Sequence, residues 1–409
     1  MNVAVLTTLL PFARRSGGEV CSARLVEALG GRATERLVIG FGDPAVPPGA
    51  SPGPEVLSLG PSPTEFAALS TAGKIAAWGR AFTSRQAWSV QRWRDGRAGA
   101  RLCAALAGRR IDLVVIDHLQ MAAWLDLLPA ATPSMLMAHN VEPEVYAALA
   151  AHSTNAAARW ALAREQRLLA RLDAEALRRV GAVACLTATD AAHYRRLAAT
   201  LGVRPRIEVL PGFFADTAGA CRECAPAAPV EPGPAARLRR RIGLIGTWNW
   251  QPNRIGLDWF VREVLPRLDC ADCEVVIAGR GLTPTELPSG VCAVGFVPSA
   301  AAFYEAVDLI AIPSLTGSGV QEKTIEAIGA FKPVVATTPA LRGLGECPPH
   351  VHCADTPAGF ADACRRALAD PAAATAARRW NAQRRADYGA ALARLLGVAS
   401  ADVSNGLRR

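Results

Sequence analysis

The sequence predicts an α/β protein made of two tandem Rossmann-like domains that face a central cleft. Three observations predict this fold: short apolar runs typical of buried strands, helical stretches that alternate with them, and an Ala/Pro-rich interruption past the middle of the chain. Strands that alternate with helices form parallel sheets joined by crossover helices. The 409 residues, 51% of them hydrophobic and 20% charged, suffice for two or three domains of about 150 residues each.

The first domain begins with a buried strand at residues 3–6, a loop containing Gly17-Gly18 and a helix over 19–29. A long amphipathic helix over 154–180 is expected to turn Trp160 inward and its arginines outward, with Gly181 as its C-cap. The remaining strands of this domain are predicted at 36–41, 113–116, 134–138 and 183–186.

An Ala/Pro-rich stretch over 216–234 disfavours both helix and central strand, because proline lacks a backbone N–H. We therefore predict a first Rossmann-like domain at 1–215, a linker at 216–238, a second Rossmann-like domain at 239–375 and a C-terminal helical segment at 376–409. In the second domain, strands are expected at 242–245, 274–278, 309–312, 334–336 and 351–354, helices at 256–268, 300–306, 323–330 and 371–396, and a turn at 294–297.

Composition excludes a disordered chain and a small disulfide scaffold. The most apolar stretch, 121–138, is interrupted by Asp126, Pro129 and Pro133, whereas a membrane-spanning helix needs about 20 apolar residues. The early apolar run precedes its arginines, the reverse of a secretory leader. We expect a cytoplasmic location, either free or peripheral at the inner face of the membrane.

The net charge of +9 comes almost wholly from arginine, since the chain has only three lysines, and an Ala- and Arg-rich composition is typical of a high-GC bacterial genome. A basic surplus favours anionic partners. Residues 74–110 place Trp78, Trp88 and Trp93 among arginines, a pattern of helices that lie on acidic lipid or of an ordinary solvated face. No nucleic-acid-binding motif accompanies the charge, so no nucleic-acid partner is expected.

A glycine turn, Gly317-Ser318-Gly319, leads into the predicted helix at 323–330. The unpaired N–H groups at a helix N-terminus form a cradle for phosphate. Lys323 would add a positive charge there, and Glu326, one turn later, would accept two hydroxyl donors such as a ribose diol. The pattern fits a nucleotide-diphosphate site, or else a plain helix start with solvent-facing side chains.

These motifs, in their order and spacing, resemble the family-4-like glycosyltransferases of the GT-B fold (glycosyl transferases group 1), in the subgroup whose donor loop carries G-x-G and a lysine. The resemblance runs over nearly the whole chain. It rests on Gly17-Gly18, Asp117-His118, His139-Asn140-Val141-Glu142, Leu210-Pro211-Gly212, Gly246 to Asn253, Ala278 to Gly281, Gly295-Phe296-Val297, Gly317 to Glu326, and Pro333 to Thr337.

The resemblance implies retaining, metal-independent, hexosyltransferase-type transfer from a nucleotide-diphospho-sugar, UDP- or GDP-linked, with no further cofactor. It makes 1–215 the acceptor-side domain and 239–375 the nucleotide-sugar donor domain. In the donor domain, Glu326 would hold the ribose and Lys323 the phosphates, and Val297 would meet the nucleobase. Ser318 stands where many members have a first glutamate, so the identity of the sugar stays open. Gly246 and Gly319 belong to the same donor loops.

In the first domain, the resemblance makes His139 the catalytic residue near the donor sugar. Gly17 and Gly18 would let the donor phosphates approach closely, since glycine has no Cβ. Asp117, His118 and Glu142 are candidates for contact with the acceptor, which is a glycan, a lipid-linked sugar or a small molecule. We expect the pathway to be surface polysaccharide or glycolipid assembly, with decoration of a natural product or a catalytically inactive binding protein as alternatives.

Other classes fit less well. A GT-B epimerase or phosphorylase shares the fold, but phosphorylases are much longer and need a pyridoxal lysine. An NAD-dependent dehydrogenase needs G-x-G-x-x-G after its first strand, and Gly17-Gly18 lacks that pattern. Zinc is not expected, and the cysteines are predicted to be reduced thiols, although the chain has two C-x-x-C pairs and a cluster: Cys221/Cys224, Cys270/Cys273, and Cys347 with His350, His352 and Cys353.

Overall fold

The computed structural model describes residues 1–13, 16–44, 53–63, 69–128, 131–214, 239–268, 273–282, 287–288, 291–297, 300–316, 320–330, 332–369 and 374–397. The chain forms two compact units: unit 1 is Met1–Leu210 with Tyr388–Arg409, and unit 2 is Pro211–Asp387. The predicted linker at 216–238 lies outside the described residues, as do Ser318 and Gly319 of the glycine turn.

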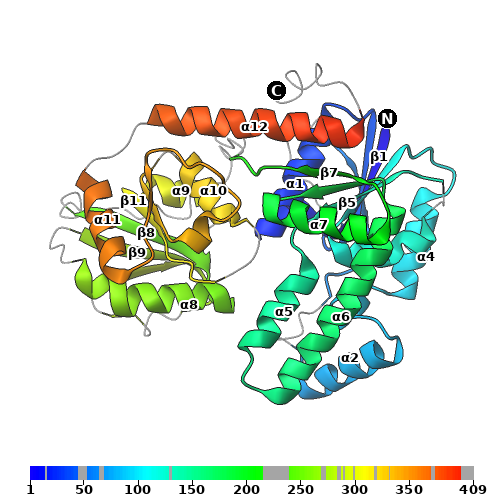
Figure 1. Ribbon diagram of the computed structural model, residues 1–409, viewed down its shortest axis with the longest axis horizontal. Coiled ribbons are helices and arrows are strands. Elements are labelled where there is room, and N and C mark those ends of the chain that lie inside the picture. The colour runs from blue at the N-terminus through cyan, green and yellow to red at the C-terminus, as the bar shows by residue number, and fades with distance from the viewer. Residues whose placement is uncertain are drawn as a thin grey trace. The chain divides into compact units, whose positions relative to one another are not determined.

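Unit 1 contains a seven-stranded sheet in the order β3-β2-β1-β4-β5-β6-β7, with every pair parallel (Figure 1). Its strands are β1 (Asn2–Leu9), β2 (Glu35–Phe41), β3 (Glu55–Ser58), β4 (Leu113–Asp117), β5 (Ser134–Ala138), β6 (Ala182–Cys185) and β7 (Arg206–Val209). Strands β1, β4 and β5 are apolar on both faces because helices cover both sides of a parallel sheet. The predicted doubly wound fold of this domain is therefore confirmed.

The helices of unit 1 are α1 (Gly17–Gly30), α2 (Thr71–Thr83), α3 (Trp88–Gln91), α4 (Gly96–Leu106), α5 (Glu142–His152), α6 (Ala156–Arg179) and α7 (Ala188–Leu201), with 3-10 segments η1 (Pro11–Ala13) and η3 (Leu119–Leu127). Helix α1 begins two residues earlier than predicted, because Ser16 caps it by accepting the N–H of Glu19 at 3.3 Å. Gly17 and Gly18 are therefore the first two helical residues and not part of a loop.

Unit 2 contains a six-stranded sheet in the order β10-β9-β8-β11-β12-β13, again with every pair parallel. Its strands are β8 (Arg240–Thr247), β9 (Cys273–Arg280), β10 (Val291–Gly295), β11 (Leu309–Ile312), β12 (Val334–Ala336) and β13 (Val351–Cys353). Its helices are α8 (Gln251–Trp259), which continues as a π turn and a 3-10 turn to Arg267, α9 (Ala300–Glu305), α10 (Glu322–Gly329), η8 (Thr338–Leu341) and α11 (Pro357–Ala369). Helix α12 (Ala374–Leu396) begins in unit 2 and ends in unit 1.

Several local predictions are wrong. Trp160 points outward and is 55% exposed, since it lies in the first turns of α6, ahead of the buried Arg164-Glu165 and Leu169. Helix α6 ends with extended backbone at Val180, and Gly181 begins the pairing with β5 instead of forming a left-handed cap. The predicted turn at 294–297 contains the end of strand β10, which pairs with β9.

The cysteines are partly as predicted. Seven described cysteines are free, including Cys347 and Cys353. Cys273 is disulfide-bonded, which corrects the prediction that all the thiols are reduced. Within the described part of the chain, no helix is long and apolar enough to cross a membrane.

Candidate active site

In unit 1, the strand order reverses between β1 and β4, and ligands of doubly wound sheets bind at the carboxyl ends of the strands that flank such a reversal. Gly17 and Gly18 start the helix that follows β1. Asp117 is the last residue of β4 and His118 follows it, while His139 follows the neighbouring strand β5. Topology thus places five of the predicted site residues at one edge of the sheet.

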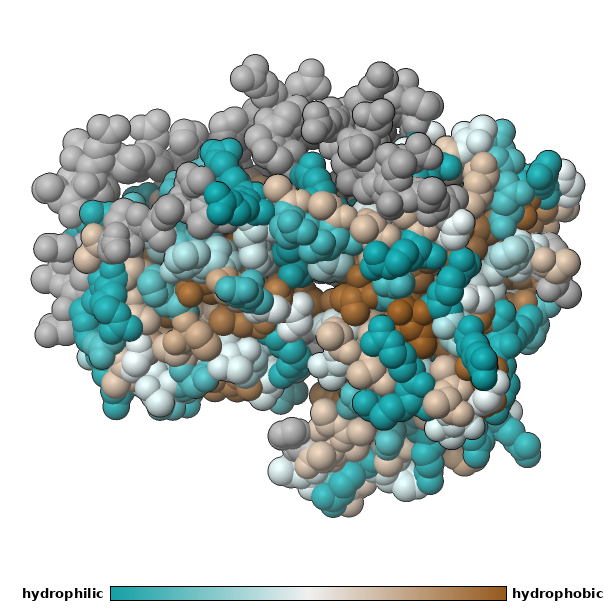
Figure 2. Space-filling model, turned by 45° about the horizontal axis from the view of Figure 1, so that its top comes forward, coloured by the Kyte–Doolittle hydropathy of each residue, from teal (hydrophilic) through white to brown (hydrophobic). Residues whose placement is uncertain are grey.

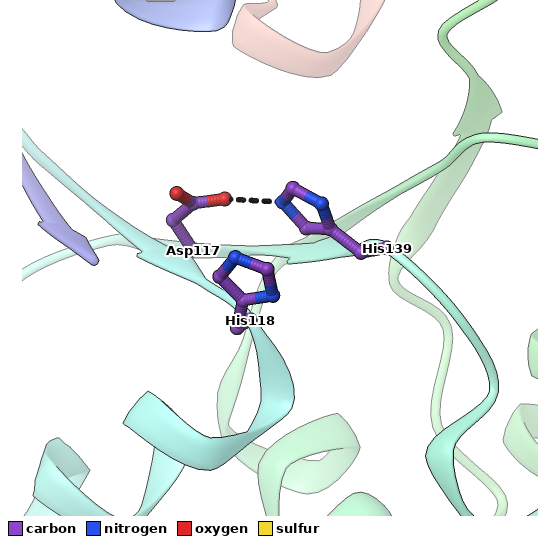
Figure 3. A group of neighbouring side chains, drawn as sticks. All are labelled: Asp117, His118 and His139. Carbon is purple, nitrogen blue, oxygen red and sulfur yellow. Dashed lines mark hydrogen bonds and ion pairs between the residues drawn. The ribbon is translucent and has the colours of Figure 1, made fainter. Parts of the chain in front are cut away.

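Three of these side chains form one cluster (Figure 3). The Oδ1 atom of Asp117 lies 2.7 Å from Nε2 of His139. The rings of His118 and His139 stack with their centroids 3.7 Å apart and their planes 18° apart. Asp117 is 0% exposed and His139 6%, so this hydrogen bond is shielded from water and holds the His139 ring in a fixed orientation.

Burial alone would raise the pKa of Asp117, but the charges of His139 and His118 and the hydrogen bond from His139 outweigh it, so that the pKa lies well below its usual range. The pKa of His118 is lowered to about 3, chiefly by burial and also by the charge of His139. At neutral pH, Asp117 is therefore ionised and His118 is neutral. An ionised Asp117 only accepts hydrogen bonds, so Nε2 of His139 carries the proton and Nδ1 is left for a ligand.

The backbone of His118 has a φ of 75° and a ψ of 139°. L-residues rarely adopt these angles, which cost about 1–3 kcal/mol and are concentrated at functional sites. Hydrogen bonds hold this backbone, because its N–H donates to the carbonyl of Met137 at 3.1 Å and its carbonyl accepts the N–H of Met121 at 3.0 Å. This backbone conformation places the His118 ring against the ring of His139.

Gly18 faces the two rings. A Cβ on Gly18 would lie 3.4 Å from Cε1 of His118 and 3.9 Å from Nδ1 of His139. A larger side chain would fill the space in front of Nδ1, so the glycine keeps this nitrogen accessible.

Glu142, the first residue of α5, lies next to this cluster. Burial raises its pKa, while hydrogen bonds with Gln120 and Asn140 and the charge of His139 act in the opposite direction. Of the predicted acceptor residues, Glu142 is thus close to His139 but is not one of the three clustered side chains.

Ligating atoms of Asp117, His118 and His139 lie within 4.8 Å of one another, close enough for a metal ion. A metal ion needs lone pairs that converge on one point. The lone pairs of stacked imidazoles lie in nearly parallel planes, and Oδ1 of Asp117 already accepts a hydrogen bond. The arrangement fits a hydrogen-bonded carboxylate–imidazole pair better than it fits a metal centre.

In unit 2, the strand order reverses between β8 and β11, and helix α10 begins at this reversal. Polar contacts hold the start of α10. The hydroxyl of Ser314 donates to Oε1 of Gln321, the residue before the helix, at 2.8 Å, and Thr337 donates to the carbonyl of Ser314. The N-terminus of α10 is thereby fixed relative to β11 and β12.

Lys323, in the first turn of α10, donates from Nζ to Oδ1 of Asn253 at 2.9 Å. Asn253 is oriented in turn by donating to the carbonyl of Thr247, at the end of β8, at 3.0 Å. Burial lowers the pKa of Lys323 to about 8. The lysine is therefore a partly desolvated cation that forms no ion pair with any described acidic residue, and an anionic ligand would stabilise its charge.

Glu326 lies one turn after Lys323 and is half-buried. Its carboxylate hydrogen-bonds with the buried hydroxyl of Tyr304, which lies 3.3 Å from the carbonyl oxygen of Lys323. Burial, followed by the charge of Glu326, raises the pKa of Tyr304 well above its usual value. Tyr304 thus contacts both residues of α10 that are predicted to bind the donor, Lys323 and Glu326.

The other predicted donor residues have packing roles in this structure. Gly246 ends β8 under the ring of Trp248, which a Cβ would meet at 3.2 Å. Val297 follows β10 and packs against the core of unit 2. Its neighbour Phe296 is 58% exposed, and the guanidinium of Arg280 lies 4.3 Å from its ring centroid.

Sequence reasoning missed Asn253, Tyr304 and the Arg280–Phe296 pair as site residues. Asn253 and Phe296 lie within motifs of the resemblance, which was the available signal. No local pattern singles out Tyr304, because its contact with Glu326 spans two helices.

Residues 239–370 match the sequence profile of the family described as glycosyl transferases group 1. Unit 2 therefore carries a group 1 glycosyltransferase domain. The match includes β8, α10 and the two residues of α10 that are predicted to bind the donor, Lys323 and Glu326, so the matched segment contains the second reversal point. No curated protein matches the chain in sequence.

Solved structures extend the likeness over the whole chain. An α,α-trehalose-phosphate synthase (UDP-forming) from Burkholderia xenovorans, in complex with glucose-6-phosphate, has a TM-score of 0.62 at 15% identity, with 97% of this chain and 100% of that chain covered. HepE from Anabaena, in complex with UDP and glucose, has a TM-score of 0.58 at 15% identity, covering 98% and 100%. WaaG, a glycosyltransferase involved in lipopolysaccharide biosynthesis, has a TM-score of 0.55 at 16% identity, covering 94% of each chain. These similarities show that the fold is GT-B, as the sequence predicted.

Proposed function

We propose that this glycosyltransferase transfers a sugar from a nucleotide-diphospho-sugar bound by unit 2, with retention at the anomeric carbon and without a metal ion. The observation that carries the proposal is that Lys323 and Glu326 both lie on α10, at the reversal point of the group 1 domain. One residue matches a diphosphate and the other a ribose, and the two are one helical turn apart.

The diphosphate would lie at the N-terminus of α10, where the helix dipole and Lys323 supply positive charge. Glu326 would accept hydrogen bonds from the ribose hydroxyls, since an ionised carboxylate only accepts. The base would contact the backbone at Val297, beside the exposed ring of Phe296. HepE was solved with UDP-glucose, which supports a UDP-linked donor; a GDP-linked donor is the other possibility to test.

In unit 1, we assign His139 to the reacting sugar. Retaining transfer in this family has no clear protein nucleophile and depends on positioning and on stabilising the leaving phosphate. Nδ1 of His139 lies beside Gly18, which has no side chain to cover it, so Nδ1 can hydrogen-bond a sugar hydroxyl or, when the ring is protonated, a developing negative charge. The clustered Asp117 and His118 act on His139 and not on the acceptor.

The pathway we propose is assembly of a surface polysaccharide or glycolipid. WaaG is involved in lipopolysaccharide biosynthesis, and 94% of its chain aligns with this structure. This similarity supports the proposed pathway. The acceptor is then a glycan or a lipid-linked sugar.

A thermal-shift panel of UDP, GDP, ADP, dTDP and their common sugars tests the donor site. A ligand at 100 times its dissociation constant stabilises by about 2.7 kcal/mol, which is easily measured. We expect one nucleotide to stabilise the wild type and the control Glu263→Ala, an exposed glutamate of the same unit, but not Glu326→Ala. Stabilisation that persists in Glu326→Ala would contradict the ribose assignment.

We also propose that unit 1 docks on acidic lipid, through apolar side chains other than the predicted tryptophans. Trp93 is in the core, and Trp78 and Trp88 are partly buried. The exposed apolar side chains are instead Ile75 (68%) and Phe82 (60%) of α2, together with Leu149 (40%) of α5 and Trp160 of α6. Figure 2 shows the end of unit 1 that carries these helices as a mixture of pale-brown and teal residues. Apolar residues beside arginines suit an anionic interface.

Sedimentation with vesicles of phosphatidylglycerol and phosphatidylcholine tests this surface. We expect the wild type to sediment and Ile75→Ser/Phe82→Ser to stay in the supernatant, while Ile255→Ser, an exposed apolar residue of unit 2, behaves as the wild type. Equal sedimentation of all three proteins would exclude α2 as the docking surface.

A further inference from the structure

A cavity of about 270 Å³, open to solvent, lies in unit 1 among α3, η3 and α6. The segment η3 begins directly after His118, but the first residue of η3 that lines the cavity is Ala122. Neither Asp117 nor His139 lines it, so the cavity is separate from the cluster of Asp117, His118 and His139. Pockets for drug-sized ligands occupy about 300–1,000 Å³. This cavity therefore suits a small group.

The lining is strongly basic. Four arginines line it, Arg85, Arg94, Arg171 and Arg179, against two acidic residues, Asp126 and Glu175. Arg179 is already paired with Asp126, and it also donates to the carbonyl of Leu125 at 2.7 Å. Three guanidinium groups therefore remain against the single carboxylate of Glu175.

Two of these guanidinium groups are available for a ligand. Within the described part of the chain, neither Arg85 nor Arg171 forms an ion pair, not even with Glu175, which lies four residues after Arg171 on α6. Uncompensated positive charges that share one cavity repel each other. An anion placed between them would remove this repulsion.

Neighbouring groups fix parts of the cavity wall before any ligand binds. The guanidinium of Arg94 lies over the buried ring of Trp124, 5.7 Å from its centroid. The backbone of Arg85 has a φ of 53°, a left-handed conformation that is unfavourable for an L-residue and that recurs at ligand sites. The walls also include apolar side chains, among them Leu168 and Leu172, which suit the carbon skeleton of an ester.

We propose that this cavity binds a phosphomonoester, with Arg85 and Arg171 as the main contacts and Arg94 as a fixed third charge. Guanidinium groups bind phosphate oxygens in pairs of parallel hydrogen bonds, which gives both affinity and geometry. The ester is either a soluble sugar or glycerol phosphate or the headgroup of an acidic lipid, which share this chemistry. The site does not depend on the donor assignment in unit 2.

Calorimetric titration with glycerol 3-phosphate tests the site. We expect Arg85→Gln/Arg171→Gln to bind at least about tenfold more weakly than the wild type, because two charge-assisted contacts are lost. The control Arg167→Gln/Arg178→Gln removes two exposed arginines of the same helix that do not line the cavity, and should bind as the wild type. Equal affinity in all three proteins, or no binding by the wild type, would overturn the proposal.

A second measurement needs no variant. Phenylglyoxal modifies accessible arginines, and peptide mass spectrometry reads each position. We expect glycerol 3-phosphate to protect Arg85 and Arg171 but not Arg167 or Arg178 of the wild type. Equal modification with and without the phosphate would contradict the site, even if the double variant failed to fold.

Vesicles distinguish the two sources of the ester. If Arg85→Gln/Arg171→Gln also loses sedimentation with phosphatidic acid vesicles, and glycerol 3-phosphate competes in the wild type, the ligand is a lipid headgroup. If only binding of glycerol 3-phosphate is lost, the ligand is soluble. Turnover of the nucleotide sugar is measured in parallel. Its presence or absence tests the proposed function only, whereas binding of glycerol 3-phosphate tests the cavity only.

Discussion

The two units place different chemistry at the same topological position. In unit 1 the reversal between β1 and β4 carries Asp117 and His139, which are buried and joined by a hydrogen bond, and His118, which is half-buried and stacks on His139. In unit 2 the reversal between β8 and β11 carries Lys323 and Glu326, half-buried and held by neutral partners. The first arrangement orients one imidazole, whereas the second offers opposite charges to a ligand. Loss of the first should therefore affect turnover, and loss of the second should affect binding.

The largest effect is expected for Asp117→Asn. The amide keeps the size of the carboxylate but can donate to His139, so the ring no longer needs to protonate Nε2. In a serine protease the corresponding change lowers kcat by roughly ten-thousandfold, because the imidazole takes the wrong tautomer, and we expect kcat to fall by up to that factor with the donor KM little changed. Steady-state kinetics measure both constants.

The control for that variant is Asp362→Asn, an exposed aspartate on α11 that pairs with Arg365. It should retain full activity. If Asp117→Asn raised KM and left kcat unchanged, Asp117 would contact a substrate directly and would not be a positioning residue for His139.

The next effect is expected for Glu326→Ala. Each hydrogen bond to a charged group contributes about 1.5–3 kcal/mol, so loss of two ribose contacts should weaken nucleotide binding by about a hundredfold. The fold should persist, since the residue is half-buried on α10. Titration of the nucleotide measures the affinity, and full turnover at low donor concentration would show that the ribose is held elsewhere.

A smaller effect concerns pH in unit 2. The pKa of Lys323 is about 8 in the free protein, and a bound diphosphate would raise it, so binding takes up a proton above pH 8. The association constant should then fall by up to about tenfold per pH unit above pH 8 and be flat below it. Lys323→Met should bind more weakly and lose this dependence, measured between pH 7 and 9. If the association constant of the wild type did not change with pH, Lys323 would not bind the phosphates.

The smallest effect concerns stability in unit 1. The pKa of His118 is about 3 when folded and about 6.5 when unfolded, so between these values the unfolded chain binds an additional proton. The free energy of unfolding should therefore decrease as pH falls below 6.5, by at most about 1.4 kcal/mol per unit from this residue. His118→Asn removes the titrating group, and Asn is more common than most residues at positive φ, which is 75° here. Urea unfolding between pH 5 and 7 should show a shallower pH dependence for the variant, and identical slopes would place the effect elsewhere.

Short apolar runs were sufficient to predict most of the architecture. Residues 3–6, 134–138 and 309–312 form strands as predicted, because a run that is apolar at every position must be buried on both faces. The placement of Lys323 and Glu326 one turn apart on one helix likewise depends on local geometry. Trp160 shows the limit: helical periodicity identifies an amphipathic helix but not how far along it the covered face extends.

The sequence by itself determined the fold class, the two parallel sheets and the motif residues at their carboxyl ends, since these follow from hydrophobic pattern and strand order. Only the tertiary structure decided which of those residues act together. The contact between Asp117 and His139 joins two strands, that between Lys323 and Asn253 joins residues 70 apart in the chain, and the cavity at Arg85 assembles three separate segments. Such contacts depend on strand pairing, burial and backbone strain at single positions, which no local pattern of residues encodes.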